Sequence, residues 1–237
     1  MDIAKAKKLL EQAGMLGCIE LHPFFTADPL CYPDLWELLD KANSLGMKIV
    51  FYTNAQDLGP MERTYLMGYR KVALTVSLDA CTEGVYKKVR PGLDFETVVQ
   101  NVEAALQLAR TSGHETRLNY VLIPGVNDHE AVEFQATWHD KADAITVVPN
   151  DSRGRIAGAD HSSTGSCGAL WTGLSVLSDG TAVMCCQDYK PLAPLGNVFD
   201  ESLEAVWNGP MLQWVRELHR TGRKNQIAAC ASCKTRY

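Results

Sequence analysis

The sequence lacks the features that mark several classes of protein. No apolar run approaches the roughly 20 residues that a membrane helix needs, and the start, from Met1 to Lys5, has no apolar segment of a secretory signal. Lys and Arg number 23 against 28 Asp and Glu, a net charge of −5, so no basic surplus is present to neutralise phosphates. We therefore expect a cytoplasmic protein that binds neither nucleic acid nor a membrane.

The chain has the composition of an ordinary globular protein. It contains 237 residues, of which 46% are hydrophobic and 22% charged, enough to bury a sizeable core. Cysteine is the unusual residue, because eight are present without an export signal. In a reducing compartment these cysteines are not expected to form disulfides, so their spacing becomes the main question.

Residues 1–150 alternate between helical and strand patterns. The strand-like runs are almost continuously apolar, as in parallel strands that helices cover on both sides. Five such strands predict an α/β fold, either a partial barrel or an open parallel sheet. The expected strands are 16–21, 48–52, 72–78, 117–123 and 144–148, and the expected helices include 4–13, 33–42, 61–67, 95–109 and 130–140.

Short polar residues follow the expected strands. In parallel α/β folds, ligands bind at the carboxyl ends of the strands. The residues that match this place are Asp28, Asn54, Ser77, Asp79, Asn119 and Asn150. Turn residues also follow strands in every fold, so each of these residues has an ordinary structural interpretation as well.

Residues 151–166 are polar and rich in Gly and Ser, which predicts a linker between a first domain, 1–150, and a second, 167–237. Asp179-Gly180 between two β-rich runs predicts a hairpin. Two helices are expected after it, one from Asp200 and one from Pro210 to Leu218. The basic residues of this region, from Arg216 to Lys224, are interpreted as a solvated helix face, with docking of an acidic partner as the alternative.

Four cysteines of the second domain are the candidate metal ligands. Cys230 and Cys233 form a C-x-x-C, and Cys167 and Cys185 supply two more thiols. Four thiolates suit zinc or an iron–sulfur cluster. Zinc fingers usually pair two C-x-x-C knuckles and this chain has one, which favours iron–sulfur. The alternative is that the cysteines are small buried hydrophobic residues.

The remaining cysteines carry no such spacing. Cys186 neighbours Cys185, and adjacent residues of a strand point to opposite faces, so only one of the two is expected at the site. Cys18, Cys31 and Cys81 are interpreted as core or loop thiols.

The second domain resembles the SPASM/twitch domain of radical SAM enzymes. The residues that carry the resemblance are Cys167, Gly180, Cys185, Gly196-Asn197, Trp207 and the pair Cys230/Cys233. In that domain a hairpin with C…G-x-x-x-x-C and a later C-x-x-C hold an auxiliary [4Fe-4S] cluster. The resemblance thus implies one such cluster on Cys167, Cys185, Cys230 and Cys233.

The first 150 residues are similar to the radical SAM partial barrel. Asp28-Pro29 resembles the end of the family's G-G-E-P segment, 49–54 its T-N strand, and 76–90 its S-L-D…R segment. The resemblance implies S-adenosylmethionine (SAM) contacts at the matching positions, which are Asp28, Asn54, Ser77, Asp79 and Arg90.

Two departures from the family pattern concern SAM. The family's C-x-x-x-C-x-x-C, which holds the cluster that binds SAM, has no counterpart in this sequence, so we expect the chain to begin after the first barrel strand. Thr26-Ala27 replaces the two glycines that let the backbone approach SAM. We therefore expect this chain alone to bind SAM weakly or not at all.

The resemblance supports three hypotheses. In the first, the chain is a portion or degenerate member of a radical SAM/SPASM oxidoreductase or maturase that modifies a peptide or small molecule. Its partners would be a reducing ferredoxin or flavodoxin, or a chain that supplies the missing segment. In the second, it is a non-catalytic iron–sulfur protein for electron transfer or scaffolding. In the third, it is a zinc-stabilised binding module.

Overall fold

The computed structural model describes residues 1–150, 166–186, 188–231 and 233. The chain divides into two compact units. Residues 19–150 form one, which we call the sheet unit. Residues 1–18 and 151–237 form the other, which we call the cysteine unit. The predicted linker, 151–166, lies outside the described residues except for Ser166.

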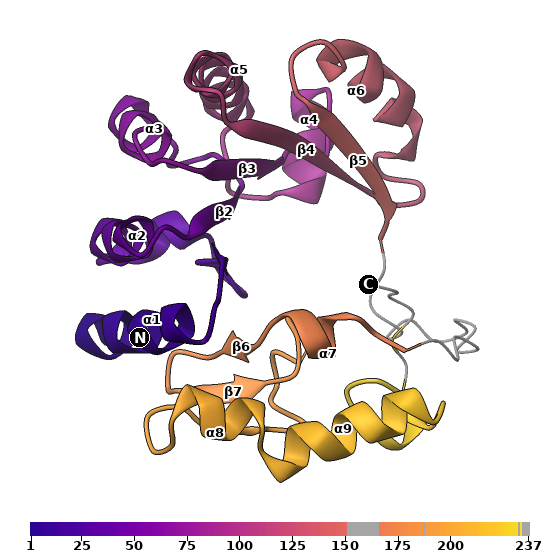
Figure 1. Ribbon diagram of the computed structural model, residues 1–237. Helices are drawn as coiled ribbons and strands as arrows, with labels where there is room; N and C mark the ends of the chain where they lie inside the picture. Colours follow the sequence, from indigo (N-terminus) through magenta and orange to yellow (C-terminus); the bar gives the residue numbers. More distant parts are fainter. Residues whose placement is uncertain (151–165, 187, 232, 234–237) are drawn as a thin grey trace. The chain divides into compact units, whose positions relative to one another are not determined.

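The sheet unit contains a five-stranded parallel sheet in which the strands follow their order in the sequence. Such an array requires a crossover after each strand, which the helical segments between the strands supply. The expected α/β fold with a partial parallel barrel is confirmed (Figure 1). Its strands are β1 (Glu20–Leu21), β2 (Lys48–Thr53), β3 (Val72–Ser77), β4 (Glu115–Leu122) and β5 (Ala144–Pro149).

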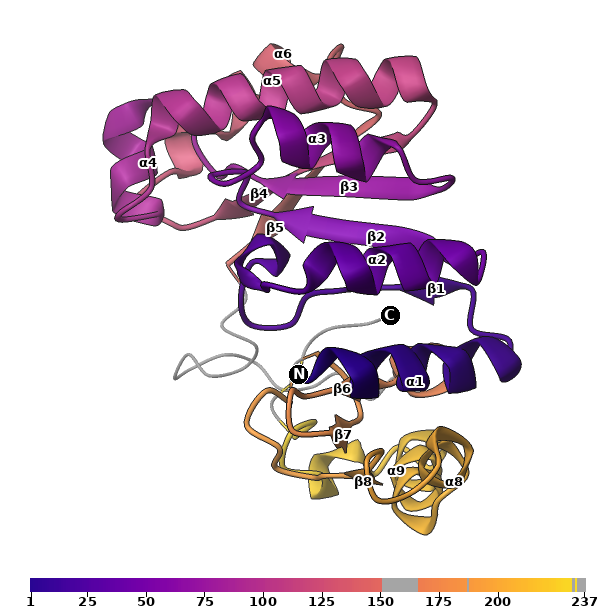
Figure 2. The same ribbon diagram turned by 90° about the vertical axis from the view of Figure 1, so that its left-hand side faces the viewer.

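Helices pack on the outer face of this sheet, and α2, α3 and α5 lie side by side along it (Figures 1 and 2). The longest, α5, begins where Asp94 Oδ1 accepts a hydrogen bond from the Thr97 N–H and ends at Gly113, which has a φ of 72°. The helices of the unit are α2 (Leu35–Ser44), α3 (Pro60–Met67), α4 (Glu83–Val89), α5 (Phe95–Ser112) and α6 (Ala131–Trp138), with short 3-10 turns η1 (Pro29–Cys31) and η2 (Asp128–Glu130).

The core of the sheet unit lies between these helices and the sheet. Phe51, Leu74 and Leu118, from three neighbouring strands, are all buried, as are Val98 and Val102 of α5. Burial of these side chains is the main favourable term in folding the unit. It also fixes where the carboxyl ends of the strands lie.

The described part of the cysteine unit combines an antiparallel sheet with four helices. Its sheet order is β6 (Ser175–Val176), β7 (Thr181–Val183) and β8 (Gly196–Asn197), which confirms the predicted hairpin around Asp179-Gly180. Its helices are α1 (Ile3–Met15), α7 (Ala169–Thr172), α8 (Leu203–Trp207) and α9 (Pro210–Arg220), followed by the 3-10 turn η3 (Lys224–Gln226).

The first helix, α1, packs within the cysteine unit although it lies at the other end of the sequence. Gln12 Oε1 accepts a hydrogen bond of 2.9 Å from the Leu203 N–H at the start of α8. The ammonium of Lys5 lies 4.4 Å from the centre of the Phe199 ring, and Leu9 packs against the core of the unit. A helix with one apolar stripe can thus bury that stripe far from its sequence neighbours.

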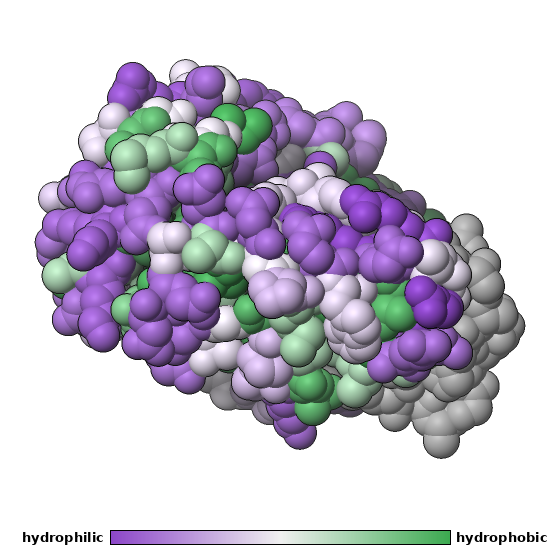
Figure 3. Space-filling view, turned by 60° about the horizontal axis from the view of Figure 1, so that its bottom comes forward, coloured by the Kyte–Doolittle hydropathy of each residue, from purple (hydrophilic) through white to green (hydrophobic). Residues whose placement is uncertain are grey.

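The surface is of mixed character. Hydrophobic side chains lie in separate patches among hydrophilic ones on the face drawn in Figure 3. Among the described helices, none combines the length and the apolar character needed to cross a membrane.

Candidate iron–sulfur site and strand-end site

The hairpin of the cysteine unit depends on two glycines. Gly180 has a φ of 87°, and a β carbon there would lie 2.5 Å from Asn197 Oδ1 and from the Phe199 ring. Gly196 has a φ of 144°, and a β carbon would lie 3.0 Å from Glu201 Oε1. Asn197 closes the turn, because its Nδ2 donates to the Asp179 carbonyl over 3.1 Å. These residues therefore hold β7 in place just before Cys185.

The four predicted ligands lie next to three different elements of the cysteine unit. Cys167 precedes α7, Cys185 follows β7, and Cys230 and Cys233 follow η3. Cys230 is buried, whereas the other three are half-buried. Cys186 is exposed, as expected if only one of the adjacent cysteines faces inward.

The pKa of Cys230 depends on burial and on the charges of the three other predicted ligands. The pKa of the Cys230 thiol is raised to about 12, first by burial and then by the charges of Cys185, Cys233 and Cys167, whereas the charge of Lys224 lowers it. Each of those three thiolates thus disfavours ionisation of Cys230, which requires proximity inside a poorly solvated region. Four thiols so arranged ionise together when a cationic metal centre neutralises their charge.

The donor set has the chemistry of an iron–sulfur site. Four cysteine thiolates are the ligands that hold [4Fe-4S] clusters, and the same set also suits zinc. Among the described residues, no three His, Cys, Asp or Glu side chains stand at the spacing of ligands to a single metal ion. The fit therefore rests on the four thiols and their shared environment.

Three further side chains contact the predicted ligands. His219 Nε2 lies 3.4 Å from Cys230 Sγ, and the Cys230 thiol contacts Met184 Sδ, also at 3.4 Å. His219 Nδ1 accepts from the Cys167 N–H over 3.3 Å. Lys224 Nζ donates to the Cys233 carbonyl over 3.4 Å. Sequence reasoning did not place these residues at the site, because it assigned His219 and Lys224 to a solvated helix face and gave Met184 no role.

The prediction of a solvated basic face between Arg216 and Lys224 is wrong for three of its residues. Arg216, His219 and Lys224 are all buried. Arg216 Nε donates to the Leu170 carbonyl over 2.9 Å, and its guanidinium lies 4.3 Å from the centre of the Trp207 ring. Burial and the charge of Arg220 lower the pKa of Arg216. Long basic side chains can bury when backbone carbonyls and aromatic rings replace water.

The buried position of His219 favours its neutral form. Burial, with a smaller contribution from the charge of Lys224, lowers the pKa of His219. A neutral imidazole has one N–H donor and one acceptor nitrogen. Its contacts with the Cys167 N–H and with Cys230 Sγ therefore use the two different roles.

A second candidate site lies at the carboxyl ends of the sheet strands. Asp28 and Asn54 are in direct contact there. Asp28 Oδ2 accepts from the Asn54 N–H at 2.7 Å and from Thr53 Oγ1 at 2.8 Å, while its Oδ1 accepts from the Leu30 N–H at 3.1 Å. The carboxylate oxygens of Asp28 thus already accept hydrogen bonds that hold the end of β2 in place.

Asp79 and Arg90 form an ion pair in the same region. Arg90 Nε donates to Asp79 Oδ2 over 3.0 Å, and the Asp79 side chain is only 3% exposed. Asp79 Oδ1 accepts from the Val121 N–H at 2.8 Å, and the residue has a φ of 63°. These partners account for both carboxylate oxygens.

Ser77 ends β3 and pairs in register with Asn119 of β4. Thr53 pairs with Val76, so Asn54 follows on the neighbouring strand at the level of Ser77. Neighbouring strands lie about 4.8 Å apart, so Asn54, Ser77 and Asn119 form a polar row across three strands. The structure therefore brings the predicted residues to one edge of the sheet as two contacting pairs and a row.

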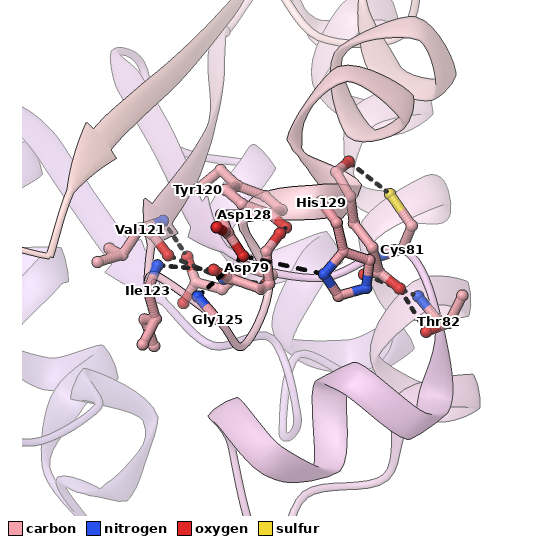
Figure 4. A network of polar contacts seen from close by, with 11 residues as sticks. Asp79, Cys81, Thr82, Tyr120, Val121, Ile123, Gly125, Asp128 and His129 are labelled. Carbon is pink, nitrogen blue, oxygen red and sulfur yellow. Dashed lines mark hydrogen bonds and ion pairs between the residues drawn. The ribbon is translucent and has the colours of Figure 1, made fainter.

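Hydrogen bonds from the loop after β4 hold this edge of the sheet in place (Figure 4). Asn127 is fully buried, and its Nδ2 donates to the carbonyls of Asp79 and Val121 at 2.8 and 2.9 Å. Its Oδ1 accepts from the Ile123 N–H at 2.7 Å. The Tyr120 hydroxyl donates to the Asn127 carbonyl. Sequence reasoning did not single out Asn127, because a lone asparagine in a loop has no distinguishing pattern.

Buried Glu130 connects the loop to the residues after Asp79. Its Oε2 accepts from the Cys81 N–H at 2.7 Å, and its Oε1 accepts from the Thr82 hydroxyl. Burial, with the charge of Glu130 as the next cause, raises the pKa of Cys81 to about 12. Cys81 thus stays a protonated structural thiol, in agreement with its interpretation from the sequence.

Two family models match the chain. Residues 1–136 match the model of the radical SAM superfamily, and residues 167–234 match the SPASM iron–sulfur cluster-binding domain.

Curated relatives are longer than this chain. Mycofactocin maturase MftC of Mycobacterium tuberculosis is 29% identical over 172 residues, which cover 71% of this chain and 42% of that protein. GTP 3',8-cyclase of Cyanothece sp. is 32% identical over 121 residues, which cover 47% of this chain and 36% of that protein. The matched part thus spans about two fifths of these relatives.

Solved structures share the fold. Streptococcus suis SuiB bound to the precursor peptide SuiA superimposes with a TM-score of 0.71 at 16% identity, covering 98% of this chain and 63% of SuiB. The enzyme anSMEcpe with bound AdoMet gives a TM-score of 0.68 at 13% identity, covering 99% of this chain and 77% of that one.

Proposed function

The chain belongs to the radical SAM superfamily and has a C-terminal SPASM iron–sulfur domain. From this premise we propose a function for four of its cysteines. They hold one auxiliary [4Fe-4S] cluster, with Cys167, Cys185, Cys230 and Cys233 as ligands. The cluster serves a radical-based modification or oxidation of a peptide or a small molecule. Iron–sulfur clusters and SAM are the cofactors of the superfamily as a whole.

The observation that carries the proposal is the environment of Cys230. Its thiol is buried, and the charges of the three other proposed ligands all act on it. Four thiols in such a place have no favourable charged state by themselves. A bound cluster neutralises their negative charge and makes ionisation favourable.

When bound, an iron–sulfur cluster exchanges single electrons or takes a substrate atom on an iron. The protein's own groups then set the surroundings of the ligands. Lys224 brings a positive charge next to Cys233, and Met184 packs against Cys230. A reducing partner of the ferredoxin or flavodoxin type fits one-electron chemistry at this site.

The relatives support the proposed substrate class. One curated relative is a maturase, and SuiB has been solved with a precursor peptide. Because the chain spans only part of these proteins, the substrate of this chain is a proposal of the same class, a peptide or a small molecule.

Anaerobic reconstitution with iron and sulfide tests the cluster. We expect about four irons with matching sulfide per chain and a brown visible chromophore. Replacement of a ligand, Cys230→Ala or Cys185→Ala, removes the chromophore. The matched control is Cys186→Ala, which changes the exposed neighbour of Cys185 and leaves the iron content unchanged.

Two results would contradict this proposal. One zinc and no iron per chain would replace the redox site by a structural one, the zinc-stabilised module. Equal loss of iron from Cys186→Ala and Cys185→Ala would break the ligand assignment.

A second candidate, a non-catalytic iron–sulfur protein, is favoured by the contacts of Asp28. Its carboxylate already accepts three hydrogen bonds from Leu30, Thr53 and Asn54, and Arg90 is paired with Asp79. Groups engaged in this way have little left to offer an amino acid ligand. We therefore propose that this chain alone binds SAM weakly.

Equilibrium dialysis with radiolabelled SAM measures that affinity. We expect no saturation at micromolar SAM, for the wild type and for Ser77→Ala alike. Ser77 is the control position because it ends β3 within the polar row. Saturable binding of SAM at micromolar concentration, weakened tenfold or more by Ser77→Ala, would refute the proposal. It would favour a catalytic protein that uses SAM.

A further inference from the structure

His219 lies between two of the proposed ligands. It belongs to α9 and is buried, with 4% of its surface exposed. Its Nδ1 faces the backbone N–H of Cys167, and its Nε2 faces Cys230 Sγ. One imidazole thus bridges the ligand that precedes α7 and the ligand that follows η3.

The contact with Cys167 determines the tautomer. A backbone amide can only donate, so Nδ1 must be the acceptor in the 3.3 Å contact. A neutral imidazole whose Nδ1 accepts carries its proton on Nε2. The proton on Nε2 therefore points along the 3.4 Å contact with Cys230 Sγ.

We propose that His219 is a positioning residue that donates an N–H···S hydrogen bond to the Cys230 thiolate and thereby raises the reduction potential of the auxiliary cluster. This inference rests on the proposed function, because it needs Cys230 to be a ligand. Nothing is transferred in the contact, since the proton stays on nitrogen and the bond is electrostatic.

The direction of the effect follows from charge. Reduction adds one negative charge to the cluster and its thiolates, so a donor on a ligand sulfur stabilises the reduced state more than the oxidised one. Hydrogen bonds to the sulfurs are among the features that set cluster potentials. The second neighbour of Cys230, the Met184 thioether, has no proton to donate.

The helix holds the imidazole rigidly. Arg216, one turn earlier on α9, donates to the carbonyls of Leu170 and Trp207 at 2.9 and 3.2 Å. Leu218 and Val215 are buried in the core of the unit. A donor fixed in this way loses little conformational entropy when the bond to sulfur forms.

Three variants of the full chain test the proposal after anaerobic reconstitution. His219→Leu removes the donor and keeps an apolar side chain of similar volume. His219→Gln restores an amide N–H at a comparable reach. His139→Leu is the control, because His139 is an exposed histidine of the sheet unit.

The readouts are iron content, the midpoint potential from an EPR-monitored redox titration, and the coupling of an exchangeable proton to the reduced cluster. We expect unchanged iron content in all variants. His219→Leu moves the potential to a more negative value and loses the proton coupling, while His219→Gln returns both toward the wild type. His139→Leu changes neither.

Failure of this inference differs from failure of the proposed function. If the wild type holds four irons and His219→Leu has the wild-type potential and proton coupling, the inference is overturned and the cluster stands. If the wild type holds no iron, the proposed function falls and the electronic role of His219 falls with it. If long-range ¹H–¹⁵N NMR of the metal-free protein shows the His219 proton on Nδ1, the tautomer argument is overturned.

Discussion

At the scale of single residues, polar side chains at the strand ends serve mainly to build the edge of the sheet. Asp28, Asp79 and Asn127 each satisfy two or three backbone or side-chain groups of neighbouring segments. Polar groups that are buried need such partners, because an unsatisfied one costs roughly 1–3 kcal/mol. Residue types that suggest a ligand site in the sequence can therefore have all their hydrogen-bonding groups engaged within the folded protein.

Asn127→Ala tests this structural role. The change leaves two carbonyls and the Ile123 N–H without their partner inside the protein. We expect the free energy of unfolding to fall by about 2–4 kcal/mol in urea unfolding followed by circular dichroism.

Gln100→Ala is the control for Asn127→Ala in the same unit. Gln100 is exposed on α5 and contacts Glu96 at 3.2 Å, so its loss should cost under about 0.5 kcal/mol. Comparable losses in the two variants would show that the buried amide is not needed for the loop.

Prediction from the sequence failed at the residue scale wherever a partner came from a distant segment. The basic run from Arg216 to Lys224 contains charged residues that normally face water. Its burial depends on carbonyls of Leu170, Trp207 and Cys233, which no local pattern reveals. The expectation that only one of Cys185 and Cys186 faces inward agrees with their burial, half-buried against exposed, although both residues follow β7 rather than lie in a strand.

At the scale of elements, strong local signals located most helices and strands. The predicted helices at 4–13, 61–67 and 95–109 match α1, α3 and α5, with ends that shift by a few residues. The turn at Asp179-Gly180 was identified because the dipeptide is a strong hairpin signal. Short elements such as α4, α7 and β8 were missed, since seven residues or fewer carry little periodicity.

The hairpin offers a prediction at this scale. Gly180→Ala places a β carbon 2.5 Å from Asn197 Oδ1 at a φ of 87°, so it adds a clash to the backbone strain. Strain alone costs roughly 1–2 kcal/mol, and the clash raises the expected loss of stability to about 2–4 kcal/mol. Because the hairpin positions Cys185, reconstituted iron should fall as well.

Gly222→Ala is the control that separates backbone strain from the steric clash in Gly180→Ala. Gly222 has a φ of 70°, in the same unit, but nothing lies within 4 Å of a β carbon there. We expect a loss of about 1 kcal/mol and normal iron content. Thermal unfolding and iron analysis of both variants are the measurements, and equal effects in the two would disprove the role assigned to the close approach at Asn197.

At the scale of the whole molecule, the boundary between units does not follow the order of the chain. The sequence predicts a first domain over 1–150, whereas α1 packs in the cysteine unit through Gln12, Lys5 and Leu9. The apolar stripe of an amphipathic helix indicates that the helix packs against an apolar surface, but the stripe does not identify that surface. The sheet unit accordingly begins at Ile19, after the first helix.

The amino-acid sequence by itself determined the class of fold, the hairpin and the set of four candidate thiols, because periodicity, turn chemistry and cysteine spacing are local properties of the chain. Only the tertiary structure decided that Cys230 is the buried thiol on which the charges of the other three act, that His219 contacts two of the proposed ligands, and that Asp28 and Arg90 are already engaged. The burial of a residue and its hydrogen-bond partners depend on segments that are distant in sequence, so they cannot be deduced from a short stretch of the sequence.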